Sequence, residues 1–413
     1  MFTLPSFGQE RIQDSKVDSF AFIGSKRMSQ DFLARMVRMK KGVQLDSAVI
    51  QKDMILLRRL TGVAHSTFQI VAAPTGETHL FYTIKENFTL IPQANTWTVN
   101  DDEIAYRAGL YEYNLLGRNI TFGGFYQNNG FDSYGLNVNA PYLFSRSFGF
   151  AINYLDWTSQ EPLFFEEGTT QYIYNNRSIE LLGVYEHQLY HNFRFGFNLF
   201  NEEYTFKEGF NTDEIPQQLS LDKFMLKSVY TYDKRDYEYY FVSGFQNILN
   251  LQYVDTVEGE QPDFLIGWND FLYYKRIGER GNWANRLRFG IATNDESPLA
   301  PFSLDNNLNI RGVGNIIDRG TASLVLNTEY RYTLFKKNWF VLQGNAFVDT
   351  GTWRNPGGEL SDFWDPENMR LFPGLGLRLI HKHIFNAIFR IDYGYGVGEK
   401  DNSGIVFGVG QYF

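Results

Sequence analysis

Thr321-Ala322-Ser323-Leu324-Val325-Leu326-Asn327-Thr328-Glu329-Tyr330-Arg331-Tyr332-Thr333-Leu334 is the stretch that decides the fold of this chain. Its apolar residues alternate with polar ones: the apolar set is Ala322, Leu324, Leu326, Tyr330 and Tyr332, and the polar set is Ser323, Asn327, Glu329 and Arg331. Successive side chains of a β-strand point to opposite faces, so the stretch predicts a strand with one apolar and one polar face. Segment 384–395 repeats the pattern, with Phe389, Ile391 and Tyr393 opposite Arg390 and Asp392. Lipid outside and a wet lumen inside explain both faces, which predicts a membrane-spanning β-barrel.

The composition supports strands rather than membrane helices. The 413 residues include 26 Tyr, 38 Phe and 37 Gly, yet the mean hydropathy is only −0.33. No run approaches the ~18 consecutive apolar residues that a membrane-spanning helix needs, so a helical membrane protein is excluded. Abundant aromatic residues and glycine suit strands whose two faces meet different solvents. On composition alone, a soluble β-sandwich or propeller fits equally well.

The charge balance and the lack of cysteine exclude several kinds of site. With no Cys in the sequence, neither disulfides nor thiolate metal sites can contribute. The net charge of −9 argues against a nucleic-acid surface, which needs a basic patch. His187 and His191 lie at a strand end, and His381 and His383 flank a short turn, so neither pair defines a metal site. No Ser/His/Asp or paired-carboxylate arrangement stands out, and we predict neither an enzyme nor a cofactor.

From residue 87 onward, turn residues divide the sequence into segments of strand length. Sixteen strands are predicted, at 88–99, 103–114, 119–128, 132–142, 146–158, 169–187, 193–204, 221–233, 238–253, 263–276, 281–294, 321–334, 338–350, 371–381, 384–395 and 403–413. The connections differ in length: the short ones are 115–118, 233–236, 336–338 and 382–383, and the long ones are 159–168, 205–220, 295–320 and 351–370. An even strand number with short turns and long loops segregated is typical of a closed outer-membrane barrel. A soluble sandwich has no reason to segregate them.

Residues 16–87 predict a small α+β domain in front of the barrel at 88–413. A strand at 16–24 leads to a helix capped by Ser29, and a second helix follows the cap residue Asp46. Two strands, at 66–73 and 77–86, complete a β-α-α-β-β order. A basic run is interpreted as the solvated side of the helices, with binding of an anionic partner as the alternative; it comprises Arg35, Arg38, Lys40, Lys41, Arg58 and Arg59. Residues 1–15 are interpreted as a leader remnant or linker.

One arginine stands in a glycine-rich loop, Leu308-Asn309-Ile310-Arg311-Gly312-Val313-Gly314. Strand parity places Glu329 and Asp349 on the luminal face of the next two strands. A guanidinium can hold carboxylates bidentately and stays charged in a partly dry lumen, so we predict that Arg311 reaches inward to these acids. Hairpin counting sets Glu329 opposite roughly Gln343 and leaves Asp349 nearer the external end. We therefore expect Arg311 to engage one acid chiefly.

The chain ends in Phe407-Gly408-Val409-Gly410-Gln411-Tyr412-Phe413, which we predict to form the end of the last strand. Gly404, Gly408 and Gly410 offer no side chain for packing. They suit a seam between the last strand (403–413) and the first (88–99) that can open. Simple tapering of the barrel explains these glycines equally well.

Several motifs resemble those of one family of outer-membrane barrels. Ile310-Arg311-Gly312-Val313 is similar to the V-R-G-F/Y motif in the sixth external loop of the superfamily that contains BamA, TamA and the two-partner-secretion transporters. Phe347-Val348-Asp349-Thr350-Gly351 is similar to its F-x-D-x-G strand motif, and 16–87 resembles its periplasmic POTRA domain. The terminal aromatic residue, Phe413, resembles the signal by which such barrels are recognised for insertion. Further matches extend the resemblance over nearly the whole chain, at 326–330, 114–118 and 140–144.

The resemblance implies a fold and a function. It implies that loop 295–320 folds back into the lumen, where Arg311 binds acidic wall residues. It also implies insertion or translocation of unfolded or β-rich client proteins in the bacterial outer membrane, with the POTRA-like domain in the periplasm. The implied partners are these clients, outer-membrane lipids and periplasmic or lipoprotein accessory subunits, with no nucleic acid. Two features depart from the family pattern: Val313 replaces an aromatic residue, and only one POTRA-like domain is present.

Two other functions are left open by the sequence. A passive pore or surface barrel could keep the same fold without any assembly activity. An enzyme barrel acting on lipids is a further class, for which the sequence offers no catalytic residues.

Overall fold

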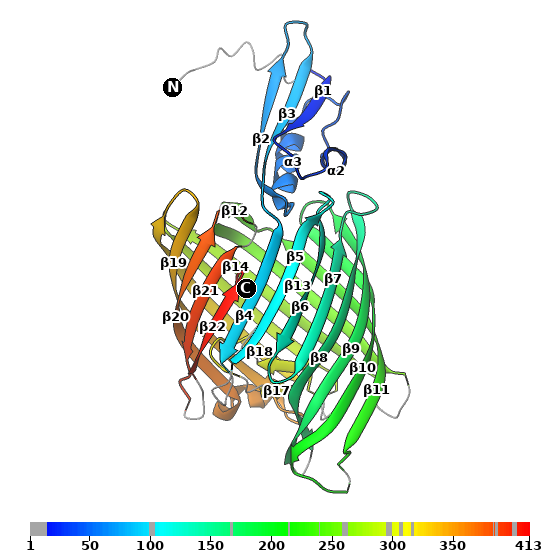
Figure 1. The fold of residues 1–413 in the computed structure, drawn as a ribbon, viewed down its shortest axis with the longest axis vertical. Helices are drawn as coiled ribbons and strands as arrows, with labels where there is room; N and C mark the ends of the chain where they lie inside the picture. The colour runs from blue at the N-terminus through cyan, green and yellow to red at the C-terminus, as the bar shows by residue number, and fades with distance from the viewer. Residues whose placement is uncertain are drawn as a thin grey trace.

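The computed structural model describes residues 15–98, 104–165, 168–213, 215–238, 240–257, 263–294, 300–304, 309–314, 318–382, 384, 387–398 and 403–413. The leader remnant or linker predicted at 1–15 lies outside this part except for its last residue. A small α+β unit stands on one end of a closed β-barrel (Figure 1). Neither α-helix in the described part of the chain is long and apolar enough to cross a membrane.

The N-terminal unit, defined here as residues 15–86, has the predicted β-α-α-β-β order. Its elements are β1 (Ser19–Ile23), α2 (Gln30–Met36), α3 (Ser47–Arg59), β2 (Val63–Ala72) and β3 (Thr78–Glu86). The helices begin where the capping residues predict, because the side chain of Ser29 accepts a hydrogen bond from the N–H of Phe32 and that of Asp46 accepts one from Ala48. The sheet order is β1-β3-β2, with β1 parallel and β2 antiparallel to β3. This small α+β region fits a POTRA-like domain.

A buried carboxylate ties the helices of this unit to its sheet. Asp53 of α3 accepts hydrogen bonds from the backbone N–H groups of Arg38 and Met39 at 2.8 and 2.9 Å and from the hydroxyl of Tyr82 at 3.1 Å. Burial and the neighbouring Asp53 raise the pKa of Tyr82, so this hydroxyl stays protonated and donates. Apolar residues of both helices surround this centre: Phe32, Leu33, Met36, Ile50, Met54 and Leu57.

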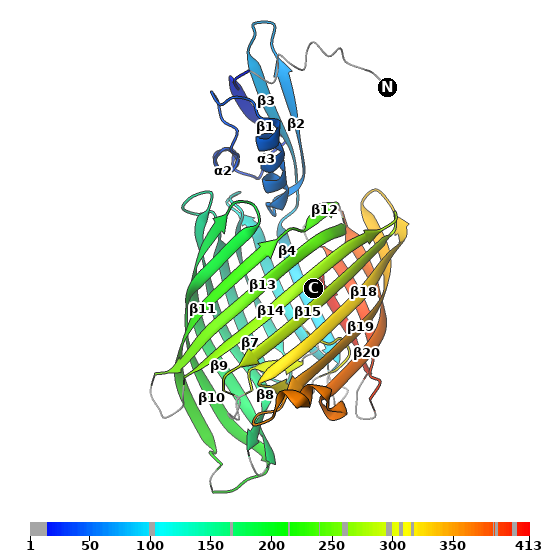
Figure 2. The same cartoon turned by 180° about the vertical axis from the view of Figure 1, so that it is seen from behind.

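Sixteen long antiparallel strands close into a barrel, as predicted. They are β4 (Leu90–Thr98), β5 (Ile104–Leu115), β6 (Ile120–Asn128), β7 (Asp132–Ala140), β8 (Phe148–Phe165), β9 (Gly168–His187), β10 (His191–Gly209), β11 (Gln218–Asp233), β13 (Phe241–Thr256), β14 (Phe264–Ile277), β15 (Gly281–Ala292), β18 (Ala322–Lys336), β19 (Phe340–Arg354), β20 (Met369–His381), β21 (Ile388–Tyr395) and β22 (Ser403–Val409). The short β12 (Asp236–Glu238) pairs with β13, and β22 closes the barrel onto β4. Figure 2 shows the opposite wall, where β13 to β15 run beside β18 to β20.

Short turns lie at the end of the barrel that carries the N-terminal unit, and long hairpins lie at the other end (Figures 1 and 2). The long-hairpin end also carries the 3₁₀ helices η1 (Leu360–Trp364) and η2 (Pro366–Asn368) and the small ladder of β16 (Phe302–Leu304) with β17 (Asp318–Gly320).

Two of the predicted long loops are wrong. Segment 159–168 is largely strand, because β8 pairs with β9 as far as Phe165 and Gly168. Segment 205–220 is half strand, because β10 runs to Gly209 and β11 begins at Gln218. The extended hairpins are held by a buried apolar cluster of Leu163, Tyr172, Tyr204, Ile215 and Leu221. A search for turn residues does not detect such tertiary packing.

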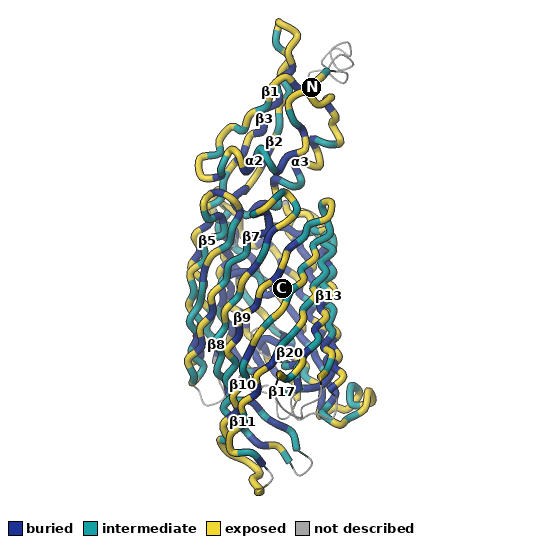
Figure 3. The backbone as a smooth tube through the Cα atoms, turned by 90° about the vertical axis from the view of Figure 1, so that its right-hand side faces the viewer, coloured by how far each residue is buried: buried dark blue, intermediate teal, exposed yellow. Residues whose placement is uncertain are grey.

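The outer face of the barrel is apolar. Large hydrophobic side chains are exposed on every side of it, for example Phe195 (64%), Leu265 (55%) and Leu375 (69%). Exposed and less exposed residues alternate along the strands (Figure 3). Exposed apolar surface on this scale, around a closed barrel with polar side chains inside, is the surface that lipid covers.

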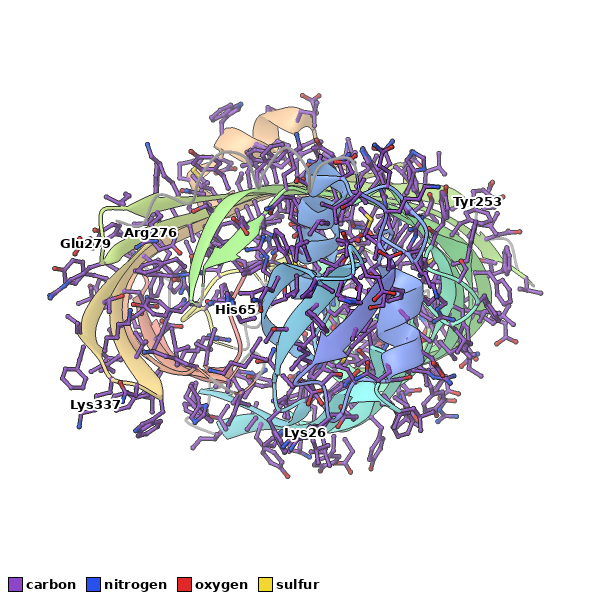
Figure 4. All side chains as sticks on the ribbon, turned by 90° about the horizontal axis from the view of Figure 1, so that it is seen from above. Lys26, His65, Tyr253, Arg276, Glu279 and Lys337 are labelled. Carbon is purple, nitrogen blue, oxygen red and sulfur yellow. The ribbon has the colours of Figure 1, made fainter. Side chains whose placement is uncertain are left out.

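The N-terminal unit is bonded to the turns of the barrel rim. Arg59 of α3 donates hydrogen bonds to the carbonyl oxygens of Leu189 and, at 2.8 Å, Asp233. Figure 4, viewed from above, shows that the unit leaves part of the barrel mouth uncovered. Other bonds reach the two preceding turns: Thr61 N–H to Asn119, Ser29 N–H to Gly117, and Arg35 to Tyr142 and Leu143.

Candidate functional site

The described part of loop 295–320 around Arg311 lies inside the barrel. The Arg311 side chain is fully buried. Ile310 and Val313, which flank Arg311 and Gly312 in the sequence, pack in one apolar cluster. Its other members are Leu304, Val325, Trp353 and Phe372. Residues 305–308, with the predicted Leu308, lie outside the described residues. Val313 therefore makes apolar contacts, although it lacks the aromatic ring found at this position of the motif that the loop resembles.

Arg311 binds two carboxylates of the barrel wall at once. Its Nε and Nη2 donate to Oδ2 and Oδ1 of Asp349 at 2.8 and 3.0 Å, which is a bidentate pair. Its backbone N–H also donates to Asp349, at 3.0 Å. Its Nη1 donates to Oε2 of Glu329 at 2.6 Å. Arg311 therefore contacts both acids, and three of these four hydrogen bonds go to Asp349.

The register of β18 and β19 explains why Arg311 reaches both acids. The sequence count set Glu329 opposite Gln343, whereas the structure pairs Glu329 with Phe347, and Asn327 with Asp349. The turn lies at 337–339, later than the count assumed, and each residue of displacement shifts the register by two. Asp349 is consequently a diagonal neighbour of Glu329 on the luminal face, so that one guanidinium reaches both.

Two glycines let the loop approach the wall. Gly312 has a φ of +97°, and a Cβ there would meet backbone atoms of Gly394 in β21 at 2.7 to 2.9 Å. At Gly351 of β19, a Cβ would lie 2.7 Å from the Leu304 side chain and 3.1 Å from that of Ile310. A side chain at either position would push the loop away from its carboxylates.

Two aromatic rings enclose the Arg311 guanidinium. The Phe347 ring centroid lies 3.6 Å from Cζ of Arg311, and the Tyr412 ring centroid lies 4.6 Å from it. The rings attract the cation through their faces, while the carboxylates bind it at its edge. Phe347 belongs to the predicted strand motif, whereas Tyr412 was expected only as part of the last strand.

The charged centre is larger than the sequence predicted. Arg331 and Arg378 each place a nitrogen 2.5 Å from Oε1 of Glu329. Asp392 lies 3.7 Å from Nη1 of Arg311 and 3.2 Å from Nη1 of Arg390. Strand parity had marked Arg331, Arg390 and Asp392 as luminal, but nothing in the sequence measured their distance from the loop, and Arg378 carried no signal. We call this group the arginine centre; it comprises Arg311, Glu329, Arg331, Asp349, Arg378, Arg390 and Asp392.

The prediction that the last strand runs to residue 413 is wrong. Strand β22 ends at Val409, and Gly410 has a φ of +104°, which turns the chain. Gln411 accepts a hydrogen bond from Arg378, and Tyr412 lies over both Arg311 and Arg390. The Phe413 ring packs against a luminal cluster on β13 to β15, formed by Val242, Leu272, Tyr274 and Ala284. These inward contacts draw the C-terminal tripeptide out of the sheet and into the lumen.

The seam between β22 and β4 is short within the part of the chain that the structure describes. There the two strands pair at three positions, Val406 with Trp97, Phe407 with Thr96, and Gly408 with Asn95. On the other side of β22, seven residues pair with β21, and β8 pairs with β9 at eighteen positions. One side-chain bond continues the seam, from the N–H of Val409 to Oδ1 of Asn95 at 3.4 Å.

Other kinds of site find no support in the part of the chain that the structure describes. No group of three or more His, Asp or Glu side chains there could hold a metal ion. His187 and His191 face each other across adjacent strands with ring centroids 6.2 Å apart, and His191 shares its Nδ1 with the hydroxyl of Tyr230 at 2.8 Å.

Comparisons with known proteins place the fold. No protein-family model matches the sequence, and no curated protein matches it. Solved structures do match. BamA from Haemophilus ducreyi lacking POTRA domains 1–3 is 14% identical, with a TM-score of 0.56 over 95% of this chain and 84% of that one.

Two further solved structures match to a similar extent. CdiB from Acinetobacter baumannii is 14% identical with a TM-score of 0.61 over 97% of this chain and 74% of that one. CdiB from Escherichia coli is 12% identical with a TM-score of 0.61 over 96% and 76%. This chain therefore has the fold of the barrels to which its motifs point.

Proposed function

We propose that this protein inserts or translocates β-rich client polypeptides at the bacterial outer membrane, with its N-terminal unit in the periplasm. The observation that carries the proposal is the short seam, because a client strand can add to a sheet only where an edge becomes free. Among the described residues, three pairs hold β22 to β4, whereas seven pairs hold β22 to β21 on its other side. The likeness of fold to BamA and CdiB supports the same reading.

The N-terminal unit offers a surface on which a client could be received first. Within the described residues, β2 pairs with β3 alone, so its other edge is unpaired. Most residues from Ala64 to Ala72 are exposed or half-buried. An extended client segment can add to such an edge by backbone hydrogen bonds. Outer-membrane lipids and accessory periplasmic subunits are the further partners of this proposal.

The arginine centre links the loop to the seam in this account. Arg311 belongs to the loop, and its guanidinium is covered by Tyr412 of the C-terminal tail. The same ring covers Arg390 of β21, the strand beside β22. If β22 moved away from β4, it would pull Gly410 with it and so displace Tyr412. Opening of the seam is thus expected to loosen the loop, and an ordered loop is expected to hold the seam closed.

A disulfide across the seam tests the proposal. The pair Thr96→Cys and Phe407→Cys joins directly opposed positions of β4 and β22. The matched control pair, Tyr393→Cys and Ile405→Cys, joins β21 to β22 on the side that stays paired. Client insertion or secretion should stop when the seam pair is oxidised and return on reduction, while the control pair remains active in both states. Unimpaired client handling with the seam locked would refute lateral opening.

The alternative of a passive pore makes the opposite prediction. Ion conductance by the purified barrel, together with unchanged outer-membrane and secreted proteins when the gene is deleted, would support it. The arginine centre and the C-terminal tripeptide occupy part of the lumen, which opposes a wide permanent channel.

A further inference from the structure

A polar cleft lies where the N-terminal unit meets the barrel rim. Its volume is about 200 Å³. One wall comes from the unit, with Arg38, Lys52 and Asp53, and the other comes from two turns of the barrel, with Arg146 and Glu186 among its residues. The cleft is thus built from both bodies, and three cationic side chains converge on it in a chain whose net charge is −9.

The two acids of this cleft are already committed to other partners. Asp53 accepts the three hydrogen bonds of the buried centre described above. Glu186 accepts hydrogen bonds from the hydroxyl of Tyr142 at 3.0 Å and from Asn192 at 3.3 Å. Within the described residues, neither carboxylate forms an ion pair with Arg38, Lys52 or Arg146.

The three cations of the cleft are not held by ion pairs. Among the described residues, no carboxylate forms an ion pair with Arg38, Lys52 or Arg146. Lys40 adds a fourth cation nearby: burial and the charge of Arg146 lower the pKa of its amine, while Asp53 opposes this effect. Like charges that approach each other and form no ion pair favour the binding of an anion.

The level of the cleft on the barrel indicates which anion is near. Arg146 lies in the turn between Phe144 and Phe148, whose side chains are 70% and 52% exposed. The Phe148 ring stacks on that of Tyr185 at 4.5 Å, and Tyr185 also lines the cleft. A ring of outward aromatic residues at the end of the strands marks the height at which lipid headgroups lie. The cleft therefore opens at headgroup level.

We infer that this cleft binds the phosphate of an anionic phospholipid of the adjacent leaflet, with Arg38, Lys52 and Arg146 as its ligands. The bound lipid would bridge the N-terminal unit and the barrel, because its phosphate contacts cations from both. Such a bridge would fix the unit over one part of the rim and leave the rest of the barrel mouth accessible. The sequence allowed two interpretations of the basic run, a solvated face or an anion site. On this proposal its residues differ in role: Arg38 binds lipid, whereas Arg35 and Arg59 bind carbonyl oxygens of the barrel.

The test uses the full-length protein in detergent and measures lipid retention by native mass spectrometry. The probes are dioleoylphosphatidylglycerol, dioleoylphosphatidylcholine and inorganic phosphate. The cleft variant is Arg38→Gln, Lys52→Gln and Arg146→Gln together. The matched control is Lys16→Gln, Arg58→Gln and Lys85→Gln, which removes three cations that do not line the cleft. Heat-modifiable migration on gels checks that each barrel is folded.

Wild type and control should retain one phosphatidylglycerol in preference to phosphatidylcholine. Each basic residue near an anionic membrane surface contributes roughly a fivefold change in binding, so the triple variant should lose about a hundredfold. Equal retention by the cleft variant, or an equal loss in the control, would overturn the assignment. Displacement of the lipid by equimolar inorganic phosphate or by an acidic peptide would show that the cleft recognises a free anion or a protein segment instead, and would overturn it as well.

Discussion

Replacing Arg311 with alanine is the sharpest perturbation of the loop. Asp349 receives three hydrogen bonds from Arg311, two from the guanidinium and one from the backbone N–H. The substitution removes the two side-chain bonds and leaves a fully buried carboxylate without its cation. Glu329 is affected less, because Arg331 and Arg378 stay within 2.5 Å of it.

The cost follows from these contacts. Removing one partner of a buried ion pair typically costs about 3–5 kcal/mol, since the other charge stays buried and uncompensated. A tenfold change in an equilibrium constant corresponds to about 1.4 kcal/mol. The docking equilibrium of the loop should therefore weaken by roughly two to four orders of magnitude.

Limited proteolysis of the folded barrel measures this effect. The site of cleavage is loop 295–320, and mass spectrometry identifies it, while heat-modifiable migration confirms that the barrel is closed. We expect Arg311→Ala to be cut much faster than wild type and to lose client handling in the same assay used for the seam.

A second substitution separates loss of charge balance from a general loss of packing. In Arg311→Ala combined with Asp349→Asn, the orphaned charge is gone, so part of the protease resistance should return and the two effects should not add. If loop resistance and client handling of Arg311→Ala both match wild type, the arginine centre does not hold the loop and the reasoning is refuted.

Three further predictions concern the neighbours of this centre and the N-terminal unit. Tyr412→Ala should speed cleavage of the loop, because it removes the ring that covers two guanidinium groups and so lowers the stability of the docked loop by about 1–3 kcal/mol. Tyr412→Phe keeps the ring and should behave as wild type. Equal cleavage rates for the two variants would contradict stacking. Gly351→Val should expose the loop to protease without opening the barrel, because its side chain would occupy the space of Leu304 and Ile310; a wild-type cleavage rate would show that the loop tolerates the displacement. Asp53→Ala should lower the free energy of unfolding of the N-terminal unit by about 2–4 kcal/mol, since two backbone N–H groups and the buried Tyr82 hydroxyl lose their acceptor. Chemical denaturation followed by the helical circular dichroism signal checks this prediction, and an unchanged midpoint would count against it.

Sequence reasoning succeeded where a local pattern has one physical cause. Alternation along Thr321 to Leu334 identified the luminal face, because side-chain direction in a strand has a period of two. Ser29 and Asp46 located both helices of the N-terminal unit, because a cap satisfies backbone groups within one turn. The number and order of the barrel strands followed from the same local signals.

Where contacts are distant, the sequence was insufficient. Arg311 can contact both Glu329 and Asp349 only because of the register between β18 and β19, which is set by the position of one turn. The sequence locates this turn only to within a few residues, and that is too coarse to fix the register. Arg378 of β20 reaches Glu329 of β18 across β19, and no local pattern in the sequence predicts that contact. Tyr412 has the alternation of a strand residue, yet cations in the lumen attract its ring and Gly410 lets the chain turn toward them.

Depletion of the protein, followed by quantitative profiling of outer-membrane and secreted proteins, tests the central claim most directly. We predict that a defined set of β-rich proteins falls in abundance, and that wild type restores it, as does the reduced form of the seam-cysteine variant but not the oxidised form. Unchanged profiles after depletion, with ion conductance by the purified barrel, would contradict a role in client insertion or translocation.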